Sequence, residues 1–335
     1  MSAGIYDGFS GTVGNTPLVR IPSLSAATGC TILGKAEFLN PGGSVKDRAA
    51  RFIVEAAERD GQLRPGSTIV EGTAGNTGIG LALMANARGY ACHIVMPSNQ
   101  SQEKIDLLRA LGAEVLLVPP APFSNPQNYY HVARERAAVM PGAFWANQFE
   151  NTANSEAHYR TTGPEIWQQT GGRLDAVVMA AGTGGTIGGI TAYLKEQAPR
   201  LLTYLIDPPG SGLYAFVSQG SFKAEGSSMT EGIGIMRETA NFRRARLDGA
   251  MQGTDLEVIE MAHYVLRRDG LFVGSSTALN LVGAVRMARR LGPGKVIATV
   301  LCDGGGRYQS RMYNAAWLSE KGLTPHSQGL EFLDG

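Results

Sequence analysis

Short apolar runs that resemble β-strands alternate with helix-like segments along most of the 335 residues. The expected strands include 68–71, 91–97, 114–118, 143–147, 175–181, 201–206 and 295–301, and the expected helices include 45–60, 79–88, 101–111, 129–140, 155–171, 255–269 and 278–291. This alternation predicts an α/β fold with parallel-type sheets covered by helices on both faces. Length suggests about two domains, each doubly wound. Ligands in such domains bind at the carboxyl ends of strands.

The 44 glycines concentrate where ligand-binding loops are expected, at the ends of strand-like runs. Gly72–Gly78 and Gly182–Gly189 each lie between an expected strand and an expected helix. Backbone N–H groups of such loops bind anions at helix N-termini. Gly72–Gly78 could equally be a turn that permits close packing. It also lacks the lysine of a nucleoside-triphosphate loop.

Composition excludes several function classes. A net charge of +1 gives no electrostatic footprint for nucleic acid or an anionic membrane, and no apolar run is long enough for a bilayer. The N-terminus lacks the features of a secretory signal. Cys30, Cys92 and Cys302 are too widely spaced for a disulfide framework or a zinc site. We therefore expect no metal and a cytoplasmic location, with a loose polar tail from about residue 319.

The segment Asn40–Arg48 introduces a helix and carries a lysine in its first turn. Ser44 with Asp47 predicts a capping box, and the apolar residues that follow recur at helical spacing until Gly61. A cation is disfavoured at the positive end of a helix, so Lys46 should lose its charge easily. A neutral amine is what Schiff-base chemistry needs. The alternative is a solvated lysine at the start of a helix.

Two further motifs allow competing interpretations. Gly182, Gly184 and Gly188 after a strand, with Asp207 at the end of the next one, resemble a dinucleotide fingerprint. Ile187 occupies the place of its third glycine, which weakens that interpretation. Ser275-Ser276 precedes a helix, so one serine should be an N-cap. The other could meet the nitrogen of a heterocycle.

Seven motifs, in the expected order from residue 14 to about 310, resemble those of fold-type II pyridoxal phosphate enzymes, which have a tryptophan synthase β-like fold. Within that group the cysteine synthases, or O-acetylserine sulfhydrylases, are most similar. The motifs are Gly14–Val19, Asn40–Arg48, Glu71–Gly78, Gln148-Phe149 followed by Thr161–Ile166, Gly182–Thr186, Glu231–Gly234 and Gly274–Ser276.

The resemblance implies a role for each matching residue. Lys46 would hold pyridoxal 5'-phosphate as an internal imine and then act as the base for the α-proton. Asn76 would bind the ring hydroxyl oxygen and Ser275 would face the pyridine nitrogen. The implied phosphate-binding residues are Gly182, Thr183, Gly184, Gly185 and Thr186. The implied substrate-binding residues are Thr73, Ala74, Gly75, Thr77, Gln148 and Gly232.

The implied reaction is β-replacement, because a neutral serine leaves the ring a weaker electron sink than an acid would. O-acetyl-L-serine and sulfide would give L-cysteine and acetate through an enzyme-bound aminoacrylate. A cystathionine β-synthase, or another β-replacement on a serine derivative, is the nearer alternative. A nicotinamide-dependent oxidoreductase built on Gly182–Asp207 is the more distant one.

The resemblance also implies an organisation. Residues 45–152 would form an N-terminal domain with a mobile part that closes on substrate, and residues 1–44 with 153–318 the cofactor-binding domain, followed by a tail, 319–335. A homodimer, and docking of a serine acetyltransferase C-terminal tail, would be typical of the family. Three departures bear on substrate identity: Ala74 replaces a serine, Thr277 replaces a glycine, and Ile235-Met236-Arg237 is unexpected.

Overall fold

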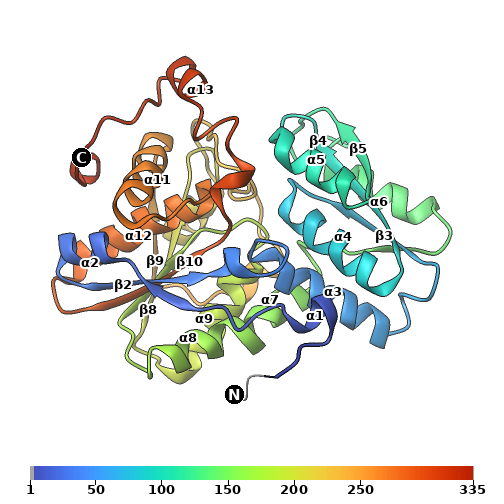
Figure 1. Ribbon diagram of the computed structural model, residues 1–335, viewed down its shortest axis with the longest axis horizontal. Helices are drawn as coiled ribbons and strands as arrows, with labels where there is room; N and C mark the ends of the chain where they lie inside the picture. The colour runs from blue at the N-terminus through green and yellow to red at the C-terminus, as the bar shows by residue number, and fades with distance from the viewer. Residues whose placement is uncertain (1–3, 335) are drawn as a thin grey trace.

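The computed structural model describes residues 4–334, and within them the strands form one six-stranded and one four-stranded sheet. Figure 1 shows the six-stranded sheet and its helices on the left, and the four-stranded sheet and its helices on the right. All strand pairs except one are parallel. The predicted α/β fold with two helix-covered, parallel-type sheets is confirmed.

The four-stranded sheet has the order β5-β4-β3-β6. Its strands are β3 (Thr68–Gly72), β4 (Ala91–Pro97), β5 (Glu114–Val118) and β6 (Ala143–Trp145). The helices of this part are α1 (Gly8–Gly11), α3 (Lys46–Arg59), α4 (Asn76–Arg88), α5 (Gln102–Ala110) and α6 (Tyr129–Val139). One apolar core unites α3, α4 and α5 with one face of the sheet, and α6 packs on the other. Most of α4 is buried, as its apolar sequence predicts.

The six-stranded sheet has the order β1-β2-β10-β7-β8-β9. Its strands are β1 (Leu18–Arg20), β2 (Thr31–Ala36), β7 (Ala176–Met179), β8 (Leu202–Asp207), β9 (Gly249–Gln252) and β10 (Val296–Leu301). Edge strand β1 is the antiparallel exception. β2, from the start of the chain, pairs in register with β10, from near its end.

Helices cover both faces of this sheet. They are α2 (Pro22–Thr28), α7 (Ala153–Ala157), α8 (Gly163–Gln169), α9 (Gly185–Gln197), α10 (Leu213–Gln219), α11 (Asp255–Asp269), α12 (Ser275–Leu291) and α13 (Ala315–Glu320). Short 3₁₀ turns lie at Glu37–Leu39, Phe242–Arg244, Gly305–Arg307 and Glu331–Leu333. The core beneath α11 and α12 is separate from that beneath α8, α9 and α10. The carboxyl ends of β7 and β10 therefore open toward the four-stranded part.

One predicted helix is interrupted. The expected helix 155–171 is observed as α7, a π-helical turn at His158–Thr162 and α8. Pro164 has no N–H to donate into the preceding turn, which favours the wider π geometry. A Cβ on Gly189 of α9 would lie 2.2 Å from the Ser155 carbonyl oxygen, so α9 packs closely against this segment. The interruption turns Thr161 and Glu165 toward α3.

The expectation of a loose tail is wrong. Leu330 and Leu333 are buried in the core formed with α11 and α12. The backbone N–H of His326 donates to Glu260 at 2.7 Å, and Arg289 donates to the Leu333 carbonyl at 2.8 Å. Two leucines three residues apart therefore hold an otherwise polar segment in place.

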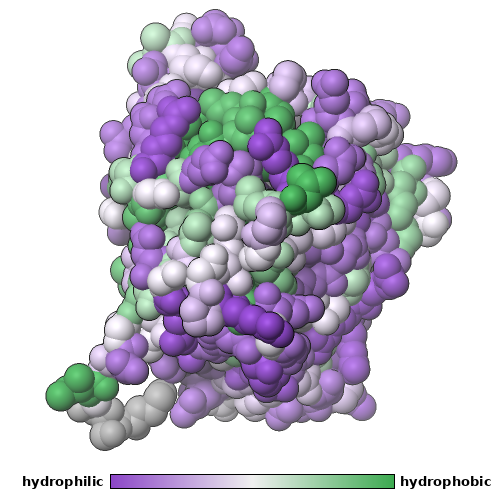
Figure 2. All heavy atoms as spheres, turned by 90° about the vertical axis from the view of Figure 1, so that its right-hand side faces the viewer, coloured by the Kyte–Doolittle hydropathy of each residue, from purple (hydrophilic) through white to green (hydrophobic). Residues whose placement is uncertain are grey.

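The outer face of the four-stranded part is largely hydrophilic, with one hydrophobic area toward the top of the view (Figure 2). Within residues 4–334 no helix combines the length and apolar character required to cross a membrane.

Candidate active site

The turn before α3 orients Lys46. Gly43 has φ of +78°, and the Gly42 N–H donates to the Asp47 carboxylate at 2.6 Å. Helix α3 begins at Lys46 with Val45 as an N-cap that makes no side-chain capping bond, so the predicted capping box is wrong. The Asp47 carboxylate reaches back to the glycine turn instead. Burial raises the pKa of Asp47 to about 7.

Lys46 lines a cavity of about 230 Å³ between the two sheets. None of the hydrogen bonds made by residues 4–334 involves its Nζ atom, which leaves the amine available. Burial lowers the pKa of Lys46, although the neighbouring Cys302 and Asp303 oppose that effect. The predicted neutral amine therefore has a structural basis, with burial as its main cause.

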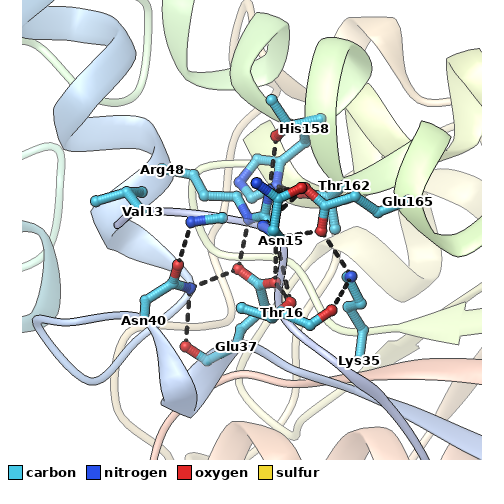
Figure 3. A network of polar contacts seen from close by, with 12 residues as sticks. Val13, Asn15, Thr16, Lys35, Glu37, Asn40, Arg48, His158, Thr162 and Glu165 are labelled. Atoms are coloured by element: carbon cyan, nitrogen blue, oxygen red, sulfur yellow. Dashed lines mark hydrogen bonds and ion pairs between the residues drawn. The ribbon is translucent and has the colours of Figure 1, made fainter. Parts of the chain in front are cut away.

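Arg48, half a turn beyond Lys46, fixes the start of α3 (Figure 3). Its guanidinium is 1% exposed and pairs with both carboxylate oxygens of Glu37 at 2.7 Å. It also pairs with Glu165 of α8, at 2.7 and 2.8 Å. Lys35 of β2 pairs with the same Glu165 at 2.6 Å. The network thus ties the lysine-bearing helix to the six-stranded sheet and to α8.

The loop after β3 faces the same cavity. Four predicted substrate-binding residues, Thr73, Ala74, Gly75 and Thr77, line it. The Thr77 hydroxyl donates to the side-chain oxygen of Gln148 at 2.6 Å, so these two side chains are brought together as predicted for carboxylate binding. Gln148 in turn donates to the Gly72 carbonyl at 2.9 Å, which fixes its amide.

Asn76 also lines the cavity, but its amide has protein partners. It donates to Asp303 at 2.7 Å and accepts from Arg307 at 2.6 Å. Binding of a ring oxygen by Asn76 stays a prediction. It would use the remaining lone pair of the amide oxygen or an exchange of partners.

The loop after β7 forms an anion cup at the N-terminus of α9. Gly184 is its N-cap, has φ of +83° and gives no side-chain cap. The Gly185 N–H donates to the Thr183 hydroxyl at 3.4 Å, and the N–H groups that follow it in the first turn are available to an anion. A Cβ on Gly182 would lie 2.1 Å from the Gly232 carbonyl oxygen, so only glycine fits there. Gly182, Thr183, Gly184, Thr186 and Gly232 all line the cavity.

Two predicted site residues do not line the cavity. Gly185 faces Asn154, whose side-chain oxygen would lie 2.0 Å from an added Cβ. Ser275 accepts from the Glu231 N–H at 3.4 Å, while Ser276 lies on the cavity wall. The role of Ser275 toward the pyridine nitrogen stays a prediction, with Ser276 as its neighbour on the cavity wall. Helix α12 begins at Ser275 with Gly274 as N-cap, and adjacent helical residues point about 100° apart, so only one serine faces the cavity.

Sequence reasoning identified the Glu231–Gly234 loop but missed Lys104, its ion pair with Glu231, and His158. Lys104 and Glu231 line the cavity as a buried ion pair of 2.5 Å, with the Tyr308 hydroxyl 3.2 Å from Lys104. His158 lies behind the cup and is 3.2 Å from the Thr186 hydroxyl. Burial, with the charges of Arg48 and Lys46, holds the pKa of His158 well below its usual value, so its imidazole is neutral. Pro164 is the one sequence feature that could have indicated the π-helical turn that places His158.

These features fit pyridoxal phosphate. The cavity combines an amine without hydrogen bonds at Lys46, an uncapped helix N-terminus lined by glycines, and a neutral hydroxyl at Ser276. In contrast, Asp207 of the dinucleotide-like pattern accepts from the Tyr214 N–H at 2.8 Å and is not on the cavity wall. Among residues 4–334 no cluster of His, Cys, Asp or Glu has the form of a metal site.

Comparison with known protein families also indicates pyridoxal phosphate as the cofactor. The pyridoxal-phosphate dependent enzyme family model matches residues 9–303, and the chain belongs to this family. The cysteine synthase of Dictyostelium discoideum is 53% identical over 328 residues, which cover 95% of this chain and 87% of the relative. Cysteine synthase 1 of Neurospora crassa is 53% identical over 325 residues, which cover 96% of this chain and 86% of the relative.

Two solved structures share the fold. An O-acetylserine dependent cystathionine β-synthase from Helicobacter pylori has a TM-score of 0.84 at 33% identity, with 92% of this chain and 98% of that chain covered. A hydrogen sulfide-producing enzyme from Fusobacterium nucleatum has a TM-score of 0.84 at 31% identity, with 91% and 100% covered. The predictions of family, fold, cofactor and an enzyme of the cysteine synthase type are confirmed. The nicotinamide interpretation is not supported.

Proposed function

We propose that the enzyme converts O-acetyl-L-serine and hydrosulfide to L-cysteine and acetate. The observation that carries this proposal is that Lys46, the Thr77–Gln148 pair and the anion cup line one cavity. The identity to cysteine synthases over nearly the full length supports it.

The residues divide the work as follows. Thr73, Thr77 and Gln148 bind the substrate carboxylate, and the N–H groups of the cup bind the cofactor phosphate. Bound pyridoxal phosphate withdraws electrons from the α-carbon. Lys46 takes the α-proton as acetate leaves the β-carbon, and returns it after hydrosulfide has formed the carbon–sulfur bond. A lowered pKa keeps Lys46 ready to accept the proton.

The proposal also covers the domain organisation, the oligomeric state and the location of the enzyme. Residues 45–152 would form the domain that closes on substrate, against residues 1–44 with 153–318. We expect a homodimer that can receive a serine acetyltransferase C-terminal tail, as the family resemblance implies. A cytoplasmic location is supported by Cys30, Cys92 and Cys302, which are free thiols.

The test is replacement of Lys46 by alanine, with purified protein supplied with pyridoxal phosphate. The wild type should form cysteine and yield a borohydride-trapped pyridoxyl adduct at residue 46, detected by peptide mass. Lys46→Ala should do neither, and Lys223→Ala, at an exposed position, should do both. Wild-type turnover by Lys46→Ala would refute the assignment.

A second candidate is β-replacement with a larger thiol. It is favoured by the structural similarity to an O-acetylserine dependent cystathionine β-synthase. Supplying O-acetylserine, O-phosphoserine or serine with either sulfide or homocysteine separates the two candidates by product.

A further inference from the structure

A second cavity, of about 500 Å³, adjoins the catalytic one. Tyr129, Phe149, Gly234 and Ile235 line both cavities, so the two spaces meet at this wall. A molecule held in the second cavity can therefore extend a reactive end toward the first. Hydrosulfide does not need such room, and the mechanism above leaves this space unused.

The walls of the second cavity combine aromatic rings with one cation. The Cζ atom of Arg237 lies 4.2 Å from the ring centroid of Phe123, 5.0 Å from that of Tyr130 and 5.2 Å from that of Phe149. Three rings hold the guanidinium in one orientation and shield it from water, which strengthens its interaction with an anion. Arg237 belongs to the Ile235-Met236-Arg237 segment, which departs from the expected family sequence.

One nitrogen of this guanidinium is unused. Nη1 pairs with Glu150, whose other oxygen accepts from the Ala240 N–H at 2.9 Å. Nη2 is buried and has no hydrogen-bond partner within the part of the chain that the structure describes. The Phe123 ring that covers the guanidinium is 40% exposed and lies in the loop between β5 and α6.

We propose that this second cavity is an acceptor subsite for a thiol that carries a carboxylate, with Arg237 Nη2 as the donor to that carboxylate. The inference rests on the proposed β-replacement. The thiol sulfur forms the new bond to the β-carbon, the bond from that carbon to the acetyl oxygen breaks, acetate leaves, and the thiol proton goes to solvent. The apolar rings then enclose the carbon chain between the sulfur and the carboxylate.

The test compares two matched acceptors, 3-mercaptopropionate and its uncharged amide, with O-acetylserine and the full-length holoenzyme. The wild type should favour the carboxylate by about tenfold in kcat/KM, mainly through KM, since a charge-assisted hydrogen bond is at stake. Arg237→Gln should lose that preference, and Arg237→Lys should keep part of it. Arg243→Gln, at a 61% exposed arginine paired with Glu238, should behave as the wild type.

Each outcome has one meaning. A wild type without the preference, or an Arg237→Gln variant that retains it, overturns the subsite. If Arg237→Gln does not fold, Phe123→Ala takes its place, and it should raise the KM of both acceptors by removing their shared apolar wall. Unchanged KM values would then overturn the subsite. Failure of the wild type to make cysteine from O-acetylserine and sulfide would instead refute the proposed function.

Discussion

Glu71, the residue before the last of β3, is fully buried behind the substrate loop. Its Oε2 accepts from the Gln148 N–H at 3.3 Å, and its Oε1 has no partner in the described residues. Burial raises the pKa of this carboxyl to about 8, against the hydrogen bond from Gln148. The side chain is therefore mostly protonated at neutral pH, next to the residues assigned to the substrate carboxylate.

Glu71→Gln should make stability less sensitive to pH. The folded state holds a proton on Glu71 from the unfolded pKa of 4.5 up to about 8, so folded wild type loses stability as pH rises through that window. The loss should be up to about 1.4 kcal/mol per pH unit. Glutamine keeps the acceptor and cannot ionise. Urea unfolding at pH 5 to 9 measures the difference, and identical pH slopes for the two proteins would contradict the assignment.

Gly182→Ala should weaken cofactor binding. The added Cβ would collide with the Gly232 carbonyl oxygen, a backbone atom that cannot turn aside. We expect the dissociation constant of pyridoxal phosphate to rise at least about tenfold, equivalent to 1.4 kcal/mol. Absorbance titration measures it. Gly11→Ala, whose Cβ would meet only ordinary contacts at 3.6 Å, is the matched control and should bind normally.

At the scale of elements, hydrophobic periodicity was sufficient to predict the bounds of a strand or helix where the segment is long and regular. The expected strand 91–97 and helix 255–269 coincide with β4 and α11. Helix α10 and strand β9 were missed, because they interrupt a Gly- and Ser-rich stretch whose short apolar runs gain their order from packing on β8. The sequence pattern identified the loops after β3 and β7, since each of these two loops follows a strand.

Which side chain of a loop faces the cavity could not be predicted. The choice between Ser275 and Ser276 depends on the residue at which α12 begins, and helix boundaries from sequence are uncertain by several residues. The orientation of Gly185 could not be predicted either, because it depends on packing against Asn154, a residue distant in the sequence. Lys104 was missed because its partner Glu231 is on the other side of the cavity.

Arg48→Met should destabilise the packing of α3 and lower the free energy of unfolding. The change removes the cation between the carboxylates of Glu37 and Glu165 and leaves both without it. Loss of one partner of a buried ion pair costs about 3–5 kcal/mol, which urea unfolding will detect. Arg51→Met, on the same helix at a partly exposed pair with Glu55, should lower the free energy of unfolding by under about 1 kcal/mol. Equal losses in the two variants would show that the Arg48 network does not anchor the helix.

At the scale of the whole molecule, polar contacts join the two sheets across the cavity. Glu103 of α5 accepts two hydrogen bonds from Ser310, and Lys104 of α5 pairs with Glu231. Arg311 pairs with that same Glu231 at 2.7 Å. These contacts hold the four-stranded part against the segments that follow β8 and β10.

Lys104→Met should lower the free energy of unfolding by about 3 kcal/mol, because Glu231 loses a buried partner and keeps only Arg311. The double variant Lys104→Met with Glu231→Leu should recover part of the loss, since the unpaired carboxylate is then absent. A double-mutant cycle in urea unfolding measures the coupling between the two residues. Strictly additive losses would contradict a direct interaction.

The pairing of β2 with β10 has a consequence for biosynthesis. Translation delivers β2, Thr31–Ala36, about 260 residues before its parallel neighbour β10, Val296–Leu301. The complete four-stranded sheet, from Thr68 to Trp145, emerges in the meantime and can fold as a unit. During that interval the nascent chain carries β2 paired with β1 but without β10 on its other edge, which is the stage at which chaperones would protect it.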